Sequence, residues 1–156
     1  MTTLPPIPTP TLMQTPPDVA DVTDVTLPRS GRHRHVPFTA HLGLVIEQAE
    51  AGTAVVSMAL QPHLLNNHGA GHGGVLMTLM DVAMANAALS RIDYAREVVT
   101  VDMHVAFMSA SSGRLVATAR ATGGGRSLCF CEARVEDENG KVAAQAMGTF
   151  RYRNAS

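Results

Sequence analysis

A glycine-rich loop leads into a long apolar segment that contains one acidic residue. The loop spans residues 66–74 and ends in His72-Gly73-Gly74, and Asp81 follows eight residues after Gly73. Backbone N–H groups at a helix start lack intrahelical partners, and with the helix dipole they favour an anion or a developing oxyanion. Glycines could also serve only to let a loop turn tightly. The nearby carboxylate favours the chemical interpretation, in which an N–H donor and an acid act on one reacting group.

Asp81 lies about two helical turns into this segment and is flanked on both sides by apolar residues. A carboxylate enclosed in such surroundings costs free energy unless it is paired or hydrogen-bonded, and it lies beyond the first turn, where the helix dipole would stabilise it. A structural salt bridge with Arg91 or Arg126 is one interpretation. We favour a catalytic base or nucleophile, because costly ionisable groups cluster at functional sites.

Other interpretations of the loop fit less well. Residues 69–74 match the G-x-G-x-x-G pattern of dinucleotide-binding folds, with Asp93 about 20 residues further on. The loop does not follow directly on an expected strand, and no second helix is expected that could complete a βαβ unit. His63, His68 and His72 have no acidic or Cys partner among them, so we expect no metal site. The absence of a G-x-S-x-G motif leaves a serine hydrolase without support.

Turn-forming residues divide the rest of the chain into short strands around one long helix. A helical turn or two is expected over residues 37–43 and the long helix over residues 73–90. Strands are expected over residues 44–51, 53–60, 98–108, 114–122, 127–135 and 142–152. Short turns such as Asn139-Gly140 indicate antiparallel hairpins, and a helix that is apolar nearly all round must be enclosed. The sequence therefore predicts an α+β fold in which an antiparallel sheet of five to six strands wraps around one long central helix.

The length and composition describe one domain with an extension. The chain has 156 residues, 46% of them hydrophobic, which is enough for one core without disulfide or metal staples. Residues 1–28 hold seven of the nine prolines. We therefore expect a disordered or extended arm over residues 1–36 and the folded domain over residues 37–153. The arm has neither a basic start nor an apolar run, so it does not resemble a secretory signal.

Charge, aromatic content and cysteines narrow the function classes. A net charge of -1 and only six aromatic residues, four Phe and two Tyr, argue against a nucleic-acid partner. No stretch approaches the ~20 apolar residues of a membrane span, so we expect no membrane partner. Cys129 and Cys131 lie two apart on an expected strand, and we interpret them as reduced thiols of a cytoplasmic protein.

Several of these residues stand at spacings that occur together in one enzyme family. Asn66, His72-Gly73-Gly74 and the segment Thr78–Asp81 resemble the hotdog-fold acyl-CoA thioesterases of the phenylacetate-degradation type, within the 4-hydroxybenzoyl-CoA thioesterase superfamily. The resemblance spans roughly residues 37–153. Flanking segments agree with it: Pro37-Phe38, Leu42-Gly43, Thr100-Val101-Asp102, Gly125-Arg126-Ser127 and Gly140.

The resemblance implies hydrolysis of an acyl-CoA thioester to free acid and CoA. Asp81 would act as general base or nucleophile, and the Gly73 N–H would stabilise the oxyanion, in a motif that also contains His72. Asn66 would help to position the thioester or the attacking water, and Thr100 would orient that water.

The CoA part of the substrate is expected to contact further residues. Gly74 could add a second N–H group near the thioester. Arg126 and Ser127 could bind phosphate, since guanidinium and hydroxyl groups suit it. No cofactor is implied, because CoA is part of the substrate.

One helix cannot supply both groups to one substrate. Eight residues at a rise of 1.5 Å separate Gly73 from Asp81 by about 12 Å, more than an Asp side chain and a reacting centre can bridge. Two antiparallel helices related by a two-fold axis would bring each N-terminus towards the other's Asp81. The sequence therefore predicts a homodimer with two composite sites, doubled into a tetramer as the resemblance also implies.

Two other function classes remain open. An enoyl-CoA hydratase or dehydratase could use the same scaffold with a His and an acid sharing the work, and His72 does not discriminate between the two enzymes. A non-catalytic acyl-CoA-binding module would use Asp81 only as a polar contact between subunits.

Overall fold

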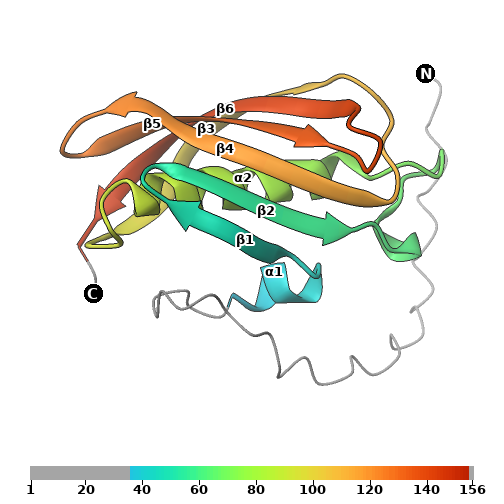
Figure 1. The fold of residues 1–156 in the computed structure, drawn as a ribbon, viewed down its shortest axis with the longest axis horizontal. Helices are drawn as coiled ribbons and strands as arrows, with labels where there is room; N and C mark the ends of the chain where they lie inside the picture. The colour runs from blue at the N-terminus through green and yellow to red at the C-terminus, as the bar shows by residue number, and fades with distance from the viewer. Residues whose placement is uncertain (1–35, 155–156) are drawn as a thin grey trace, which may run out of the picture.

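The computed structural model describes residues 36–154. The predicted N-terminal arm therefore lies almost entirely outside the described residues. The elements in chain order are α1 (Pro37–His41), β1 (Val45–Glu50), β2 (Thr53–Ala59), the 3-10 helix η1 (Pro62–Leu64), α2 (Gly73–Ser90), β3 (Glu97–Phe107), β4 (Arg114–Gly124), β5 (Leu128–Glu136) and β6 (Val142–Arg153) (Figure 1). The long helix and six strands are confirmed to within a few residues, whereas η1 was not predicted.

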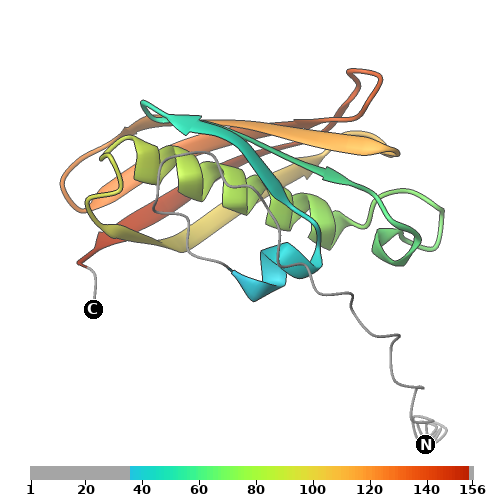
Figure 2. The same ribbon diagram turned by 60° about the horizontal axis from the view of Figure 1, so that its bottom comes forward.

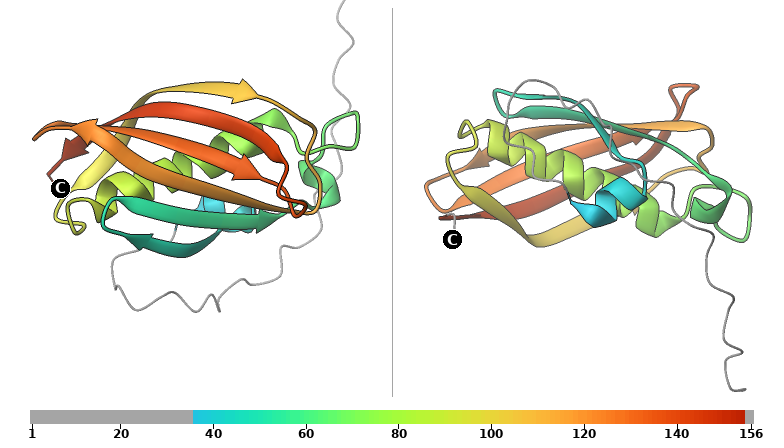
Figure 3. Two further views of the ribbon diagram at one scale, coloured as in Figure 1. Left: turned by 45° about the horizontal axis from the view of Figure 1, so that its top comes forward. Right: turned by 90° about the horizontal axis from the view of Figure 1, so that it is seen from below.

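The six strands form one antiparallel sheet in the order β1-β2-β4-β5-β6-β3. The sheet curves around α2 and covers it on one side along its whole length (Figure 2 and Figure 3). Alanines on the inner face allow this close approach because they add little bulk between strand and helix. The buried ones are Ala54, Ala117, Ala119, Ala133, Ala144 and Ala146. The predicted α+β architecture is therefore confirmed.

Helix α2 is the centre of the core. Its 18 residues contain no proline, and buried side chains such as Leu79, Met80 and Met84 lie against the sheet. By length and composition alone α2 could cross a membrane, but more than half of it is buried inside the fold, as befits the core helix of an α+β domain. The side of α2 that the sheet does not cover carries half-buried or exposed residues, among them Met77 and Asp81.

Strand β3 forms one edge of the sheet and is irregular near its middle. Its pairing with β6 shifts register between Thr100 and Asp102, which leaves Val101 as the extra residue of a β-bulge. Val101 is 57% exposed and Phe107 is 55% exposed. Among the described residues no strand pairs with the outer edge of β3. An 11-residue edge strand with exposed apolar side chains is a typical site of pairing with another chain.

The two cysteines lie on the inner face of β5. Both Cys129 and Cys131 are buried and free, with their Sγ atoms 3.8 Å apart. Burial raises the pKa of Cys131 well above its ordinary range, and the neighbouring Cys129 adds to the shift. This arrangement is compatible with the predicted pair of thiols.

Candidate active site

The loop before α2 is tied by its own polar groups. The Asn66 N–H donates to the Ala70 carbonyl at 2.7 Å, and the Asn66 Oδ1 accepts the N–H groups of His68 at 2.9 Å and Ala70 at 3.2 Å. Leu65 and Gly71 form an isolated antiparallel bridge that closes the base of the loop. Because its Oδ1 already accepts two N–H groups of the loop, the Asn66 side chain can offer a substrate only its two Nδ2 hydrogens.

The amides on either side of Gly73 are both engaged. The His72 N–H donates to the Leu64 carbonyl at 2.9 Å, and the Gly74 N–H donates to the His72 Nδ1 at 3.0 Å. Within the described part of the chain, the Gly73 N–H has no hydrogen-bond partner. Gly73 is also the first residue of α2, so its N–H lies at the positive end of the helix dipole. One free donor thus stands at the start of this helix.

His72 caps α2 through its side chain. Its Nδ1 accepts the Gly74 N–H, so in the neutral ring the proton resides on Nε2. The expectation that Gly74 supplies a second oxyanion donor is not met, because this bond occupies its N–H. His72 instead orients the first turn of the helix, as an N-cap does.

Asp81 is hydrogen-bonded from the neighbouring strand. The Thr100 Oγ1 donates to the Asp81 Oδ1 at 2.7 Å. Burial raises the pKa of Asp81 above its ordinary value of 3.8, while the hydrogen bond from Thr100 opposes this rise. None of the ion pairs among residues 36–154 involves Asp81. Arg91 donates instead to the Gly123 carbonyl, so the alternative of a structural salt bridge with Arg91 does not hold.

The two halves of the predicted site lie at separate points along α2 and β3. Gly73 lies beside Phe107, whose ring atoms come within 3.3 and 3.4 Å of the position that a Cβ on Gly73 would take. Asp81 lies beside Thr100. About 12 Å along the helix axis separates Gly73 from Asp81, so one chain does not bring them to the same atom. The Phe107 contact was not predicted, because it depends on how the end of β3 crosses the helix.

Arg126 and Ser127 lie in the connection between β4 and β5. This connection is at the C-terminal end of α2, away from Gly73 (Figure 1). The Arg96 Nη1 donates to the Arg126 carbonyl at 2.7 Å, and the Arg96 guanidinium lies 4.6 Å from the Tyr152 ring centroid. Arg96 thus stabilises the connection through this hydrogen bond. Both Arg126 and Ser127 are exposed.

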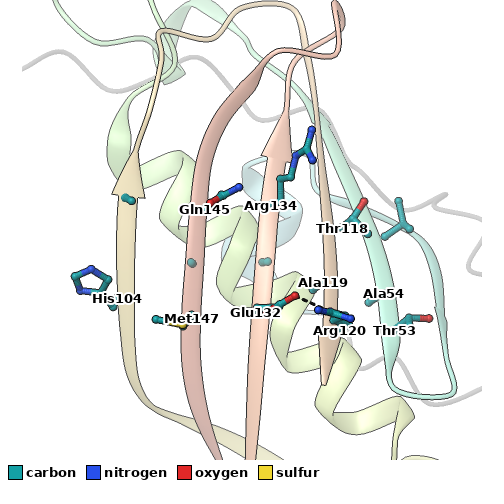
Figure 4. A pocket seen from close by; sticks show the side chains of 14 residues that line it. Thr53, Ala54, His104, Thr118, Ala119, Arg120, Glu132, Arg134, Gln145 and Met147 are labelled. Atoms are coloured by element: carbon teal, nitrogen blue, oxygen red, sulfur yellow. Dashed lines mark hydrogen bonds and ion pairs between the residues drawn. The ribbon is translucent and has the colours of Figure 1, made fainter. Parts of the chain in front are cut away.

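A groove lies on the outer face of the sheet, opposite α2 (Figure 4). It encloses about 660 Å³, and its lining includes none of the predicted site residues. Arg120 and Glu132 in this groove form an ion pair at 2.6 Å. Because the sheet separates the groove from Asp81, its residues do not contribute to the chemistry considered above.

Comparison with known proteins agrees with the geometry. The sequence profile of the "Thioesterase superfamily" matches residues 68–144, which include the end of the loop, α2 and Thr100. A protein of Deinococcus radiodurans named "Putative esterase" is 33% identical over 115 residues, which cover 72% of this chain and 76% of that protein. The chain belongs to the thioesterase superfamily. The resemblance noted in the sequence is thereby confirmed.

Solved structures of similar proteins support the fold of this thioesterase-superfamily member. The conserved protein PA5202 from Pseudomonas aeruginosa is 31% identical with a TM-score of 0.73, covering 76% of this chain and 95% of that one. The PaaI protein of the E. coli phenylacetic acid degradation operon is 26% identical with a TM-score of 0.71, covering 76% and 86%. The six-stranded sheet around one helix is the hotdog fold of this superfamily.

Proposed function

We propose that this protein hydrolyses acyl-CoA thioesters to free acid and CoA, in composite sites formed by two copies of the chain. The observation that carries the proposal is the free Gly73 N–H at the start of α2, next to amides that are all engaged. A lone donor at a helix N-terminus suits the oxygen of a tetrahedral intermediate. Membership of the thioesterase superfamily agrees with this chemistry.

The reaction would begin with the thioester carbonyl oxygen against the Gly73 N–H. Asp81 of the second copy would then follow one of two routes. Its carboxylate could attack the carbonyl carbon, expelling CoA thiolate and leaving a mixed anhydride that water cleaves. Alternatively it could take a proton from a water molecule held by Thr100, so that hydroxide adds to the carbon and CoA leaves as the thiol. Both routes need an ionised Asp81, and the hydrogen bond from Thr100 favours that form.

The free edge of β3 supports a dimer that would unite the two halves of the site. Antiparallel pairing of two β3 strands about His104 would set Phe107 of each copy opposite Val101 of the other, beside Thr100. Phe107 contacts Gly73, and Thr100 contacts Asp81. This pairing would therefore bring the oxyanion donor of each copy towards the acid of the other. The exposed apolar residues on this edge would be buried by the same contact.

The remaining predicted residues fit supporting roles. The free Nδ2 hydrogens of Asn66 would hold the thioester or the water. The phosphates of CoA would lie against Arg126 and Ser127, on the connection that Arg96 braces. Two such dimers would form a tetramer, and the free buried thiols agree with a cytoplasmic protein.

A panel of acyl-CoA esters, from acetyl to long-chain and aryl groups, would test the proposal by release of free CoA thiol. We expect turnover of at least one ester by the wild type and nearly complete loss in Asp81→Asn. Hydration of an enoyl-CoA without thiol release would indicate a hydratase instead. Tight binding of acyl-CoA without turnover of any ester would indicate a binding module, and would overturn the proposal.

A further inference from the structure

The connection between β3 and β4 lies against the glycine-rich loop that precedes α2. Its residue Ser111 is only 2% exposed, and its carbonyl accepts the Gly71 N–H at 3.0 Å. The same connection is also bonded to the residue that follows β2, because the Leu60 N–H donates to the Gly113 carbonyl at 2.9 Å. The loop that carries the free donor therefore rests on a segment about 40 residues away in sequence, from Gly71 to Ser111.

A side chain at Gly71 would fit only if its neighbours shifted. A Cβ on Gly71 would come within 2.8 Å of the Ser111 Oγ, 3.0 Å of a Leu60 methyl carbon and 3.1 Å of a Leu76 methyl carbon. Gly71 does not have a positive φ, so alanine could adopt its backbone conformation. The requirement for glycine at this position is therefore steric, and Ser111 makes the closest contact.

The hydroxyl of Ser111 has no hydrogen-bond partner among the described residues although it is buried. Leaving a buried hydroxyl unpaired is unfavourable, and no group of the described residues pairs with this one. Its position against Gly71, two residues before the free amide of Gly73, suggests a different role.

We propose that Ser111 is a positioning residue for the oxyanion donor, acting through its contact with Gly71. The Gly71 N–H is held by the Ser111 carbonyl and the His72 N–H by the Leu64 carbonyl, so the Gly73 N–H is the first amide after two fixed ones. Only two planar peptide units join Gly71 to Gly73, so we expect a displacement at Gly71 to reach the Gly73 N–H. This inference rests on the proposed function of Gly73 and adds the contact that sets its orientation.

A double-mutant cycle tests the contact. Gly71→Ala should lower kcat for the best acyl-CoA ester by about 10- to 100-fold, with KM changed by less than about twofold, because a displacement of up to ~1 Å mainly affects transition-state contacts. Adding Ser111→Ala removes the closest atom and should restore kcat at least about fivefold over Gly71→Ala alone. Gly123→Ala is the matched control, since its Cβ would meet only a Phe130 ring carbon at an ordinary 3.7 Å.

The amide resonance of Gly73 gives a readout that does not depend on turnover. Its ¹H–¹⁵N shift should change in Gly71→Ala, move back towards wild type in the double variant, and stay unchanged in Gly123→Ala. Equal kcat for Gly71→Ala and wild type, or additive effects of the two substitutions, would overturn the positioning role while leaving the thioesterase proposal intact. An inactive wild type in which the resonance still follows this pattern would instead overturn the function and keep the contact.

Discussion

The shared site can be tested by separating its two halves onto different chains. Gly73→Pro removes the proposed oxyanion donor, because proline has no N–H. The local backbone tolerates it: Gly73 is the first helical residue, a favoured place for proline, and His72 has φ -64° and ψ 137°, which suit a residue before proline. Gly73→Ala is the matched control, since it adds a Cβ against the same Phe107 ring but keeps the N–H.

The expected losses are large in each homodimer. Removing one oxyanion donor costs about 10²- to 10³-fold in kcat, and removing a general base by Asp81→Asn costs about 10²- to 10⁴-fold. The amide oxygen introduced by Asp81→Asn can still accept the hydrogen bond from Thr100, so the fold is retained. In a dimer of one Gly73→Pro chain and one Asp81→Asn chain, one site lacks both groups and the other has both.

The mixed dimer should therefore regain about half of the wild-type activity per dimer. Co-expression with two different affinity tags and tandem purification isolates it, native mass spectrometry verifies its composition, and thiol release from acyl-CoA measures its activity. If both groups came from one chain, each chain of the mixed dimer would carry one defect and it would be as inactive as its parents. That result, with an active Gly73→Ala control, would refute the shared site.

Further predictions follow from the surroundings of Asp81 and the start of α2. Because burial raises the pKa of Asp81 above 3.8, kcat/KM should fall on acidification at a higher pH than it would with an Asp of ordinary pKa. Thr100→Val removes the hydrogen bond that opposes this rise, so in a pH–rate profile the fall in kcat/KM should move to a still higher pH. A raised pKa means that the folded state prefers the protonated form of Asp81. The stability that this protonation contributes is therefore fully present below pH 3.8 and is lost as pH rises through the raised pKa. Asp81→Asn should raise Tm at pH 7, and scanning calorimetry should show that this gain disappears near pH 3.8. His72→Ala should lower the free energy of unfolding by about 0.5–2 kcal/mol in urea titrations, whereas His72→Asn should restore the cap. Val101→Lys on the exposed β-bulge should weaken dimer formation in analytical ultracentrifugation and lower activity in parallel.

The fold could largely be predicted from local signals. The bounds of α2 agree with the sequence because an apolar run of this length without proline has few other stable forms in water. The strands agree because glycine and Asn139-Gly140 turns mark their ends. The 3-10 helix η1 was missed, since a single turn after Pro62 carries no periodicity.

The site could be predicted only where one local pattern contained it. Gly73 and Asp81 stand in one helix, so their spacing and the cost of a buried acid pointed to both. Thr100 was anticipated only through the family resemblance, as the residue that orients water. Its hydrogen bond to Asp81 joins two different elements and was not predicted. Other contacts could not be predicted: the hydrogen bond of the Gly74 N–H, and the packing of Ser111 and Phe107 against glycines. The packing contacts depend on how segments distant in sequence meet in three dimensions, and the hydrophobic periodicity of the sequence does not indicate this.

Asp81 poses a conflict that the dimer would resolve. The acid must be ionised to act as base or nucleophile, yet burial in one chain already raises its pKa, and further burial at a subunit contact would raise it more. Thr100 offsets part of this effect within the chain. In the proposed pairing, the start of α2 from the second copy would also approach the carboxylate, and the positive end of a helix dipole favours a negative charge. The same contact that completes the site would therefore offset part of the rise in pKa that its own burial causes, and a variant that remains monomeric should lose the activity.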